Sequence, residues 1–141
     1  MLSIGLCIAN TEVVEYNSGM TSKGQASLKD LQAMIRKFVD DRDWDQFHNP
    51  KDLSISLALE AAEVLEHFQW KNDEEVHKHS VDKKVEVGEE LADVFYWILL
   101  IANKLDIDLV DAFEKKMTKN NTKYPIEKSR GNHKKYTEHA A

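Results

Sequence analysis

Residues 54–68 read S-I-S-L-A-L-E-A-A-E-V-L-E-H-F, and residues 86–101 read E-V-G-E-E-L-A-D-V-F-Y-W-I-L-L-I. Both stretches show the apolar spacing of a helix. Each also carries two acidic residues three positions apart, which project from one face of the helix: Glu60 and Glu63 in the first, Glu90 and Asp93 in the second. These two helices indicate both the fold and the chemistry of the chain.

A helical wheel places most of these carboxylates toward the protein interior. Glu60 lies on the same stripe as Leu57. Glu90 and Asp93 run directly into the apolar face that continues at Trp97. A carboxylate on a core-facing stripe is costly to bury unless something neutralises its charge. Two acidic pairs that face one interior therefore predict a divalent cation held between the two helices.

The ion and its alternatives follow from ligand chemistry. Mg²⁺ and Mn²⁺ prefer oxygen ligands, so four carboxylates would suit one or two such ions. The alternative is an ordinary solvated helix surface, which is our interpretation of Glu66, Glu74, Glu75 and Glu89. Glu63, at the edge of its stripe, fits either.

A di-iron bundle needs Glu-x-x-His on two helices, and the second stretch has no histidine. Surface or loop positions, rather than zinc ligation, are expected for His67, His77 and His79.

From Ser27 onward the chain reads as an all-α domain of four helices. The expected boundaries are a start at Ser27 with Asp30 in a capping box, a second helix from Asn49-Pro50 to about Trp70, a third over Lys83 to Lys104, and a fourth from near Asp108 to Tyr124-Pro125. Residues 71–82 are polar and are predicted to form a loop. We expect residues 1–26 to be a poorly ordered extension, 27–124 the domain, and 125–141 a basic, irregular tail.

Composition narrows the class of protein. The 141 residues suffice for one domain, and the single cysteine, Cys7, excludes an internal disulfide framework. The longest apolar run, residues 94–102, is too short to cross a bilayer. The net charge of −6 argues against a partner that is a nucleic acid polymer. With no basic region ahead of the apolar N-terminus, we expect no membrane association and a cytoplasmic location.

Two further features concern partners. Residues 94–102 are apolar on every face of the third helix, and such a helix must be covered on all sides, which predicts a homo-oligomer. Residues 115–136 hold eight Lys or Arg and one acidic residue, a cationic stretch that attracts anions such as phosphate. Within it, one face of the fourth helix carries Lys116, Asn120 and Lys123. The alternative is that this face of the fourth helix is basic only because it is exposed to solvent.

Aromatic side chains flank the first acidic helix: Trp44, Phe47 and His48 before it, Trp70 at its end. Such rings can stack on a nucleobase, although core packing explains most tryptophans. Together with a metal site and a phosphate-attracting helix, they suggest a nucleotide.

Several strings in order resemble the all-α nucleoside triphosphate pyrophosphatases, the MazG-like family. The acidic spacing Glu60-x-x-Glu63 and Glu90-x-x-Asp93 is shared with the whole family. The strings that resemble its dCTP pyrophosphatase branch are Arg42-Asp43-Trp44-Asp45-Gln46-Phe47-His48-Asn49-Pro50, Phe68-Gln69-Trp70-Lys71, Lys116-Met117 with Asn120 and Tyr124-Pro125, and Ser129-Arg130-Gly131 with Lys135-Tyr136-Thr137. This resemblance covers roughly residues 28–138. Two positions differ from that branch: Ile35 replaces a histidine and Trp97 replaces a tyrosine.

The resemblance implies a four-helix MazG-like bundle completed by oligomerisation, usually a tetramer built from dimers. It implies Mg²⁺ as cofactor, with Mn²⁺ as a substitute, on ligands that match Glu60, Glu63, Glu90 and Asp93. Substrate-binding positions of the family match Trp44, Asp45, Gln46, Phe47, His48, Trp70, Trp97, Lys116, Asn120, Lys123 and Tyr124.

The function expected on this basis is hydrolysis of a nucleoside triphosphate, with dCTP or a related pyrimidine deoxynucleotide giving the monophosphate and pyrophosphate, in nucleotide pool sanitation. Glu63 is the expected general base for a water that attacks the α-phosphorus. The rival hypothesis is a non-catalytic helical protein that binds a nucleotide or only oligomerises. Release of pyrophosphate distinguishes the two.

Overall fold

The computed structural model describes residues 25–138, and this range contains helices and turns but no strand. Its six α-helices are α1 (Leu28–Asp40), α2 (Pro50–Glu66), α3 (Asp73–Asp82), α4 (Lys84–Lys104), α5 (Leu109–Lys123) and α6 (Ile126–Ser129). Two 3-10 helices, η1 (Asp45–Phe47) and η2 (Tyr136–Glu138), complete the described part. The predicted all-α class is confirmed. The prediction for the N-terminal extension falls almost wholly outside the described residues.

The helices begin where their capping residues stand. The Ser27 hydroxyl accepts a hydrogen bond from the Asp30 backbone N–H at 3.2 Å, and the Asp30 carboxylate accepts one from the Ser27 N–H at 2.8 Å. Asn49 caps α2, whose first residue is Pro50. Asp108 caps α5. These side chains satisfy backbone donors that the first turn of a helix leaves open, so all three predicted starts are confirmed.

Four helices were expected from residue 27 onward and the described range has six, because three expectations about where helices lie were wrong. The helix predicted to reach Trp70 ends at Glu66, and Trp70 has a φ of 66°, a left-handed conformation that no α-helix contains. The predicted loop over residues 71–82 is mostly α3, because Asn72 and Glu75 form a second capping box that starts a helix. The basic tail, expected to be irregular, includes α6.

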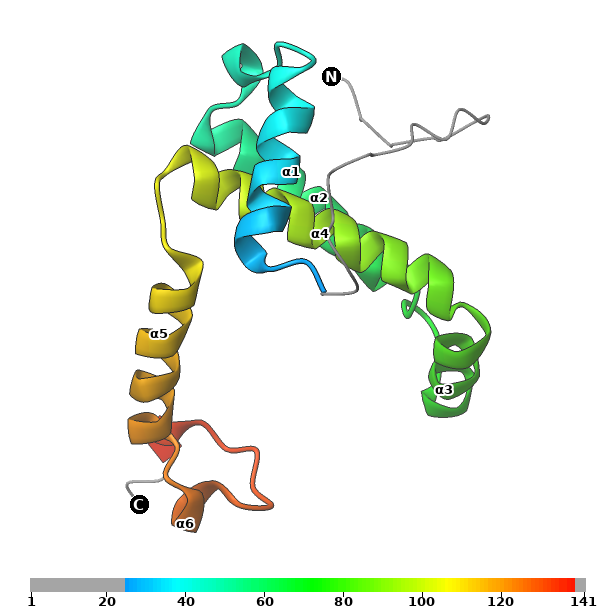
Figure 1. Ribbon diagram of the computed structural model, residues 1–141. Coiled ribbons are helices and arrows are strands. Elements are labelled where there is room, and N and C mark those ends of the chain that lie inside the picture. Colours follow the sequence, from blue (N-terminus) through cyan, green and yellow to red (C-terminus); the bar gives the residue numbers. More distant parts are fainter. Residues whose placement is uncertain (1–24, 139–141) are drawn as a thin grey trace.

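The core lies where three helices meet. Figure 1 shows α2 and α4 side by side, with α1 packed across them near the C-terminal part of α4. The buried cluster takes Ile35 and Val39 from α1, Leu53 from α2, and Leu99 and Leu100 from α4. Fully burying a side chain of this size contributes about 1.5–3 kcal/mol. Because Leu53 and Leu99 are each only 1% exposed, they fix how α2 and α4 face each other.

The α5 helix projects away from this core as an arm (Figure 1). Its apolar residues Val110 and Phe113 are 52% and 66% exposed. None of the described helices combines the length and apolar character that a membrane span would need.

Shortening either buried leucine should test this core. We expect Leu53→Ala and Leu99→Ala each to lower the free energy of unfolding by about 2–5 kcal/mol, because the cavity they leave adds to the lost burial. Val81→Ala, at a position 66% exposed, should change it by less than about 0.5 kcal/mol. Urea denaturation at one fixed protein concentration measures all three. Equal effects from the buried and exposed positions would contradict the assigned core.

Candidate metal centre

Three of the four predicted acidic residues come together between α2 and α4. Oxygen atoms of Glu60, Glu90 and Asp93 lie within 4.8 Å of one another, and all three residues are partly buried. Within residues 25–138 no other group of three or more potential ligands lies as close. The convergence follows from the packing of α2 on α4, with Glu90 and Asp93 one helical turn apart on the same face of α4.

The cluster carries negative charge, and no Lys, Arg or His of residues 25–138 forms an ion pair with Glu60, Glu90 or Asp93. Burial, followed by repulsion from Glu63, raises the pKa of Asp93. Burial is also the main cause of the raised pKa of Glu60 and of Glu90, with smaller contributions from the neighbouring carboxylates. An oxygen-only donor set with excess negative charge suits a hard divalent cation such as Mg²⁺ or Mn²⁺. The chemistry of these residues therefore fits the predicted metal.

The fourth predicted ligand, Glu63, stands at the edge of the cluster. Its side chain is exposed, and it is not among the three that converge. A hydrogen bond between the Glu63 and Glu90 side chains nevertheless helps to raise the pKa of Glu90. Glu63 is thus the acidic side chain of this group with the best access to solvent.

Trp97 touches the acidic cluster directly. Its indole N–H donates a hydrogen bond to Glu60 Oε1 at 3.2 Å, which lowers the cost of keeping that carboxylate ionised. The Trp97 ring also stands edge-on to Tyr96 and to His48, with ring centroids 5.2 Å and 6.3 Å away. Trp97 therefore orients one of the predicted metal ligands.

His48 links the segment before α2 to this centre. Its Nδ1 is buried and has no hydrogen-bond partner among the described residues. Burial is the main cause that lowers the pKa of His48, so the ring is neutral at neutral pH. This ring nitrogen beside Trp97 therefore has hydrogen-bonding capacity that no described residue uses.

The rest of this segment is held from two sides. Trp44 packs edge-on against Phe38 of α1, with ring centroids 5.9 Å apart. Asp45 accepts a hydrogen bond from Lys104 Nζ at 2.8 Å. Sequence reasoning missed Lys104, because a lysine in the last turn of a helix is ordinary and nothing in the sequence pairs it with a residue 59 positions away.

Two other predicted residues of the aromatic group face solvent. Phe47 is 66% exposed and Trp70 is 93% exposed. Gln46 is occupied locally, since its side-chain amide donates to the Asp43 carboxylate at 2.7 Å. In the single chain these three side chains therefore form no closed base pocket.

The predicted phosphate-binding residues lie on or next to α5, on the arm that Figure 1 shows extending away from α2 and α4. Lys123 Nζ lies 4.9 Å from the centroid of the Tyr136 ring, and the Tyr124 ring meets Tyr136 edge-on. The Asn120 side chain contacts Met117 of the same helix. One chain therefore does not bring Lys116, Asn120, Lys123 and Tyr124 to the acidic cluster.

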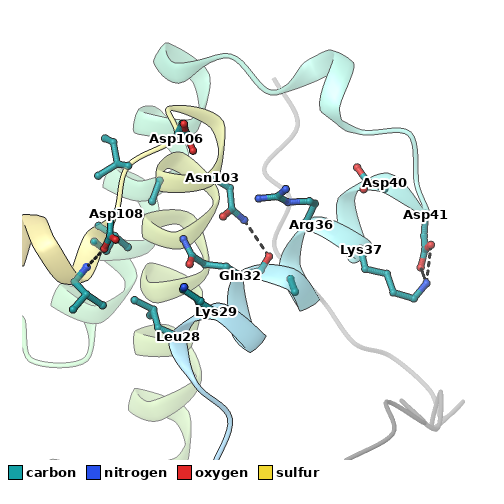
Figure 2. A pocket seen from close by; sticks show the side chains of 15 residues that line it. Leu28, Lys29, Gln32, Arg36, Lys37, Asp40, Asp41, Asn103, Asp106 and Asp108 are labelled. Atoms are coloured by element: carbon teal, nitrogen blue, oxygen red, sulfur yellow. Dashed lines mark hydrogen bonds and ion pairs between the residues drawn. The ribbon is translucent and has the colours of Figure 1, made fainter.

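A separate pocket of about 900 Å³ lies between α1 and the junction of α4 with α5 (Figure 2). Its wall mixes basic side chains such as Arg36 with acidic ones such as Asp106, and Asn103 donates a hydrogen bond to the Gln32 carbonyl at 3.1 Å. None of the predicted site residues lines this pocket.

Comparison with known proteins identifies the family of the chain. The MazG-like family model matches residues 55–138. dCTP pyrophosphatase 1 from Bos taurus is 36% identical over 116 residues, which cover 81% of this chain and 69% of that protein. Its Homo sapiens counterpart is 35% identical over 116 residues, covering 81% and 68%.

A solved structure shares the fold as well. A pyrophosphatase from Archaeoglobus fulgidus DSM 4304 superposes with a TM-score of 0.68 at 36% identity, covering 75% of this chain and 99% of that one. The chain thus belongs to the MazG-like family, in the branch that includes dCTP pyrophosphatase 1.

Proposed function

We propose that the protein is a Mg²⁺-dependent nucleoside triphosphate pyrophosphohydrolase that converts dCTP, or a related pyrimidine deoxynucleotide, to its monophosphate and pyrophosphate. The observation that carries this proposal is the convergence of Glu60, Glu90 and Asp93 between α2 and α4 in a chain of this family. Nucleotide pool sanitation in the cytoplasm is the role that such a reaction serves.

The proposed metal ligands are these three residues with Glu63, and Mn²⁺ is the expected substitute ion. Bound there, the ion would neutralise the acidic cluster, polarise phosphoryl oxygens and lower the pKa of a ligated water. Trp97 would hold Glu60 in place through its indole N–H. Glu63, the exposed member of the group, would take the proton from the water that attacks the α-phosphorus in line.

The base would bind on the aromatic side of the centre. There, the buried Nδ1 of His48 offers a hydrogen bond and Trp97 offers a ring face. The other proposed contributors are Trp44, Asp45, Gln46, Phe47 and Trp70. The net charge of −6 supports a small-molecule substrate rather than a nucleic acid polymer.

The triphosphate-binding site would be completed by a second copy of the chain. Lys116, Asn120, Lys123 and Tyr124 are carried away from the acidic cluster on the α5 arm (Figure 1). Large apolar side chains remain exposed on three helices: Ile55 and Leu59 on α2, Leu91 and Phe95 on α4, and Val110 and Phe113 on α5. Exposed apolar surface of this kind indicates a protein interface. We therefore infer a homo-oligomer, a tetramer built from dimers, in which α5 of one chain serves the acidic centre of another.

The catalytic assignment predicts a loss of turnover without a loss of fold. Glu63→Gln and Asp93→Asn should each abolish pyrophosphate release from a panel of NTPs and dNTPs, because they remove the base or a metal ligand. Glu89→Gln, an exposed neighbour on α4, is the matched control and should retain activity. Circular dichroism checks the helices, and wild-type reactions with EDTA check the metal. Near-native turnover by either centre variant, or no release from any triphosphate by wild type, would refute the assignment.

Metal binding itself should be visible as stabilisation. At about 100 times its dissociation constant, Mg²⁺ should stabilise the wild-type fold by about 2.7 kcal/mol, because it binds the folded state alone. The melting temperature of EDTA-treated protein should therefore rise on addition of Mg²⁺. Asp93→Asn should lose this rise and Glu89→Gln should keep it. A rise of the same size in Asp93→Asn would place the ion elsewhere.

Sharing of the site between chains predicts complementation. Asp93→Asn and Lys116→Ala chains should each be inactive alone, yet regain activity when co-expressed with two different affinity tags and purified through both. The recovered sites combine an intact acidic centre from one chain with an intact arm from the other. Co-expressing Asp93→Asn with Glu60→Gln, both in the acidic centre, should recover nothing. Failure of the first pair to recover activity would show that each chain uses its own arm.

A further inference from the structure

Two histidines from different helical segments meet next to the acidic centre. His67 follows the last residue of α2, and His79 lies in α3. His67 Nδ1 and His79 Nε2 are 3.0 Å apart, and their ring centroids are 5.3 Å apart. The sequence suggested separate surface histidines, because residues 71–82 were expected to form a loop. The helix that forms there instead turns His79 toward the end of α2.

Neighbouring side chains partly bury and pack against the two histidines. Both histidines are partly buried, whereas His77 on the same helix is exposed. The Phe68 ring stands edge-on to His79, with centroids 5.9 Å apart. Burial is the first cause that lowers the pKa of His79, followed by the positive charges around it. This keeps the imidazole in the neutral form that binds metals.

The distance between the two nitrogens fits a shared metal ion. Two ligand nitrogens at 2.0–2.1 Å from one zinc ion lie about 3.3–3.4 Å from each other in tetrahedral geometry and about 2.8–3.0 Å in octahedral geometry. The same distance also fits a direct hydrogen bond, in which one ring donates and the other accepts. The two arrangements use the same pair of atoms, so a metal would displace the shared proton, and the two rings would turn so that both nitrogens point at the ion.

We propose that His67 and His79 form a binding site for Zn²⁺ or a similar late first-row transition ion, which the proposed pyrophosphohydrolase activity does not require. The proposed third ligand is Glu86 on α4, whose carboxylate does not lie close to both ring nitrogens in this structure and would have to turn toward them. Its charge acts on both histidines, favouring the protonated form of His79 while His67 helps to lower the pKa of Glu86. In this structure Glu86 accepts a hydrogen bond from Lys83 Nζ at 2.7 Å, which the metal would replace. Water would fill the remaining positions.

This site differs from the acidic centre in chemistry and in consequence. Imidazole nitrogens suit Zn²⁺, Ni²⁺ or Cu²⁺, whereas the oxygen-only acidic cluster suits Mg²⁺ or Mn²⁺. An ion between His67 and His79 would tie α3 to the end of α2. The segment it closes carries Trp70, which is 93% exposed, so the ion would restrict a predicted base-binding residue without touching the substrate.

Calorimetric titration of the full chain with ZnCl₂, in saturating Mg²⁺ to occupy the acidic centre, tests the proposal. We expect His67→Asn and His79→Asn each to weaken zinc binding at least tenfold, while the matched control His77→Asn and the acidic-centre variant Asp93→Asn keep wild-type affinity. Long-range ¹H–¹⁵N spectra of the wild type should show zinc-dependent shifts at Nδ1 of one histidine and Nε2 of another, and each should vanish in its own variant.

The outcomes separate cleanly. Unchanged zinc affinity in both ligand variants would show that zinc binds elsewhere and would overturn the proposal. Loss of zinc binding in Asp93→Asn alone would place the zinc in the acidic centre and would also overturn it. No zinc binding by wild type at micromolar concentration would leave only a hydrogen bond between the rings and overturn it too. Circular dichroism confirms that α3 persists in the variants, and His79→Gln, with better helix propensity, replaces His79→Asn if it does not.

Discussion

The chemistry of the acidic centre depends on carboxylates that the packing of α2 on α4 keeps partly buried. Leu53 and Leu99, each 1% exposed, fix that packing. Glu60, Glu90 and Asp93 are therefore held partly out of solvent, and burial with repulsion from neighbouring carboxylates raises the pKa of each. The fold thus holds an electrostatically unfavourable cluster of carboxylates between α2 and α4. Such a cluster is tolerable when a cation neutralises it, and this is the condition under which a polyphosphate can also approach.

Helical periodicity and capping chemistry predicted most of the fold because both are local. Ser27, Asn49 and Asp108 mark helix starts that the structure contains. The errors came where a short polar segment carried little apolar signal. The capping box of Asn72 and Glu75 was sufficient to start α3, yet the many charges of this segment suggested a loop. The left-handed φ of Trp70 could not be read from the sequence, since it depends on how α2 must turn into α3.

The candidate site was predictable to the extent that one pair of helices builds it. The spacing of Glu60, Glu90 and Asp93 determines faces, and packing brings the faces together. The sequence also predicted that α5 has a basic face. It could not predict where that face lies relative to α2, because this depends on the Leu105–Asp108 connection and on what covers Phe113. In the proposed oligomer, contacts with neighbouring chains would determine the position of α5. The exposed apolar side chains on α2, α4 and α5 are the physical reason to look for the answer in an oligomer.

The bond from Trp97 to Glu60 bears on selectivity in the proposed pocket. An indole has one donor and no acceptor. Once its N–H is committed to Glu60 Oε1 at 3.2 Å, Trp97 presents only its ring to a base. A tyrosine, the residue found here in the dCTP branch that the chain resembles, keeps a hydroxyl that both donates and accepts. Hydrogen-bond discrimination between bases must then come from other atoms, and we propose the buried, unpartnered Nδ1 of His48 beside the same ring as one such atom.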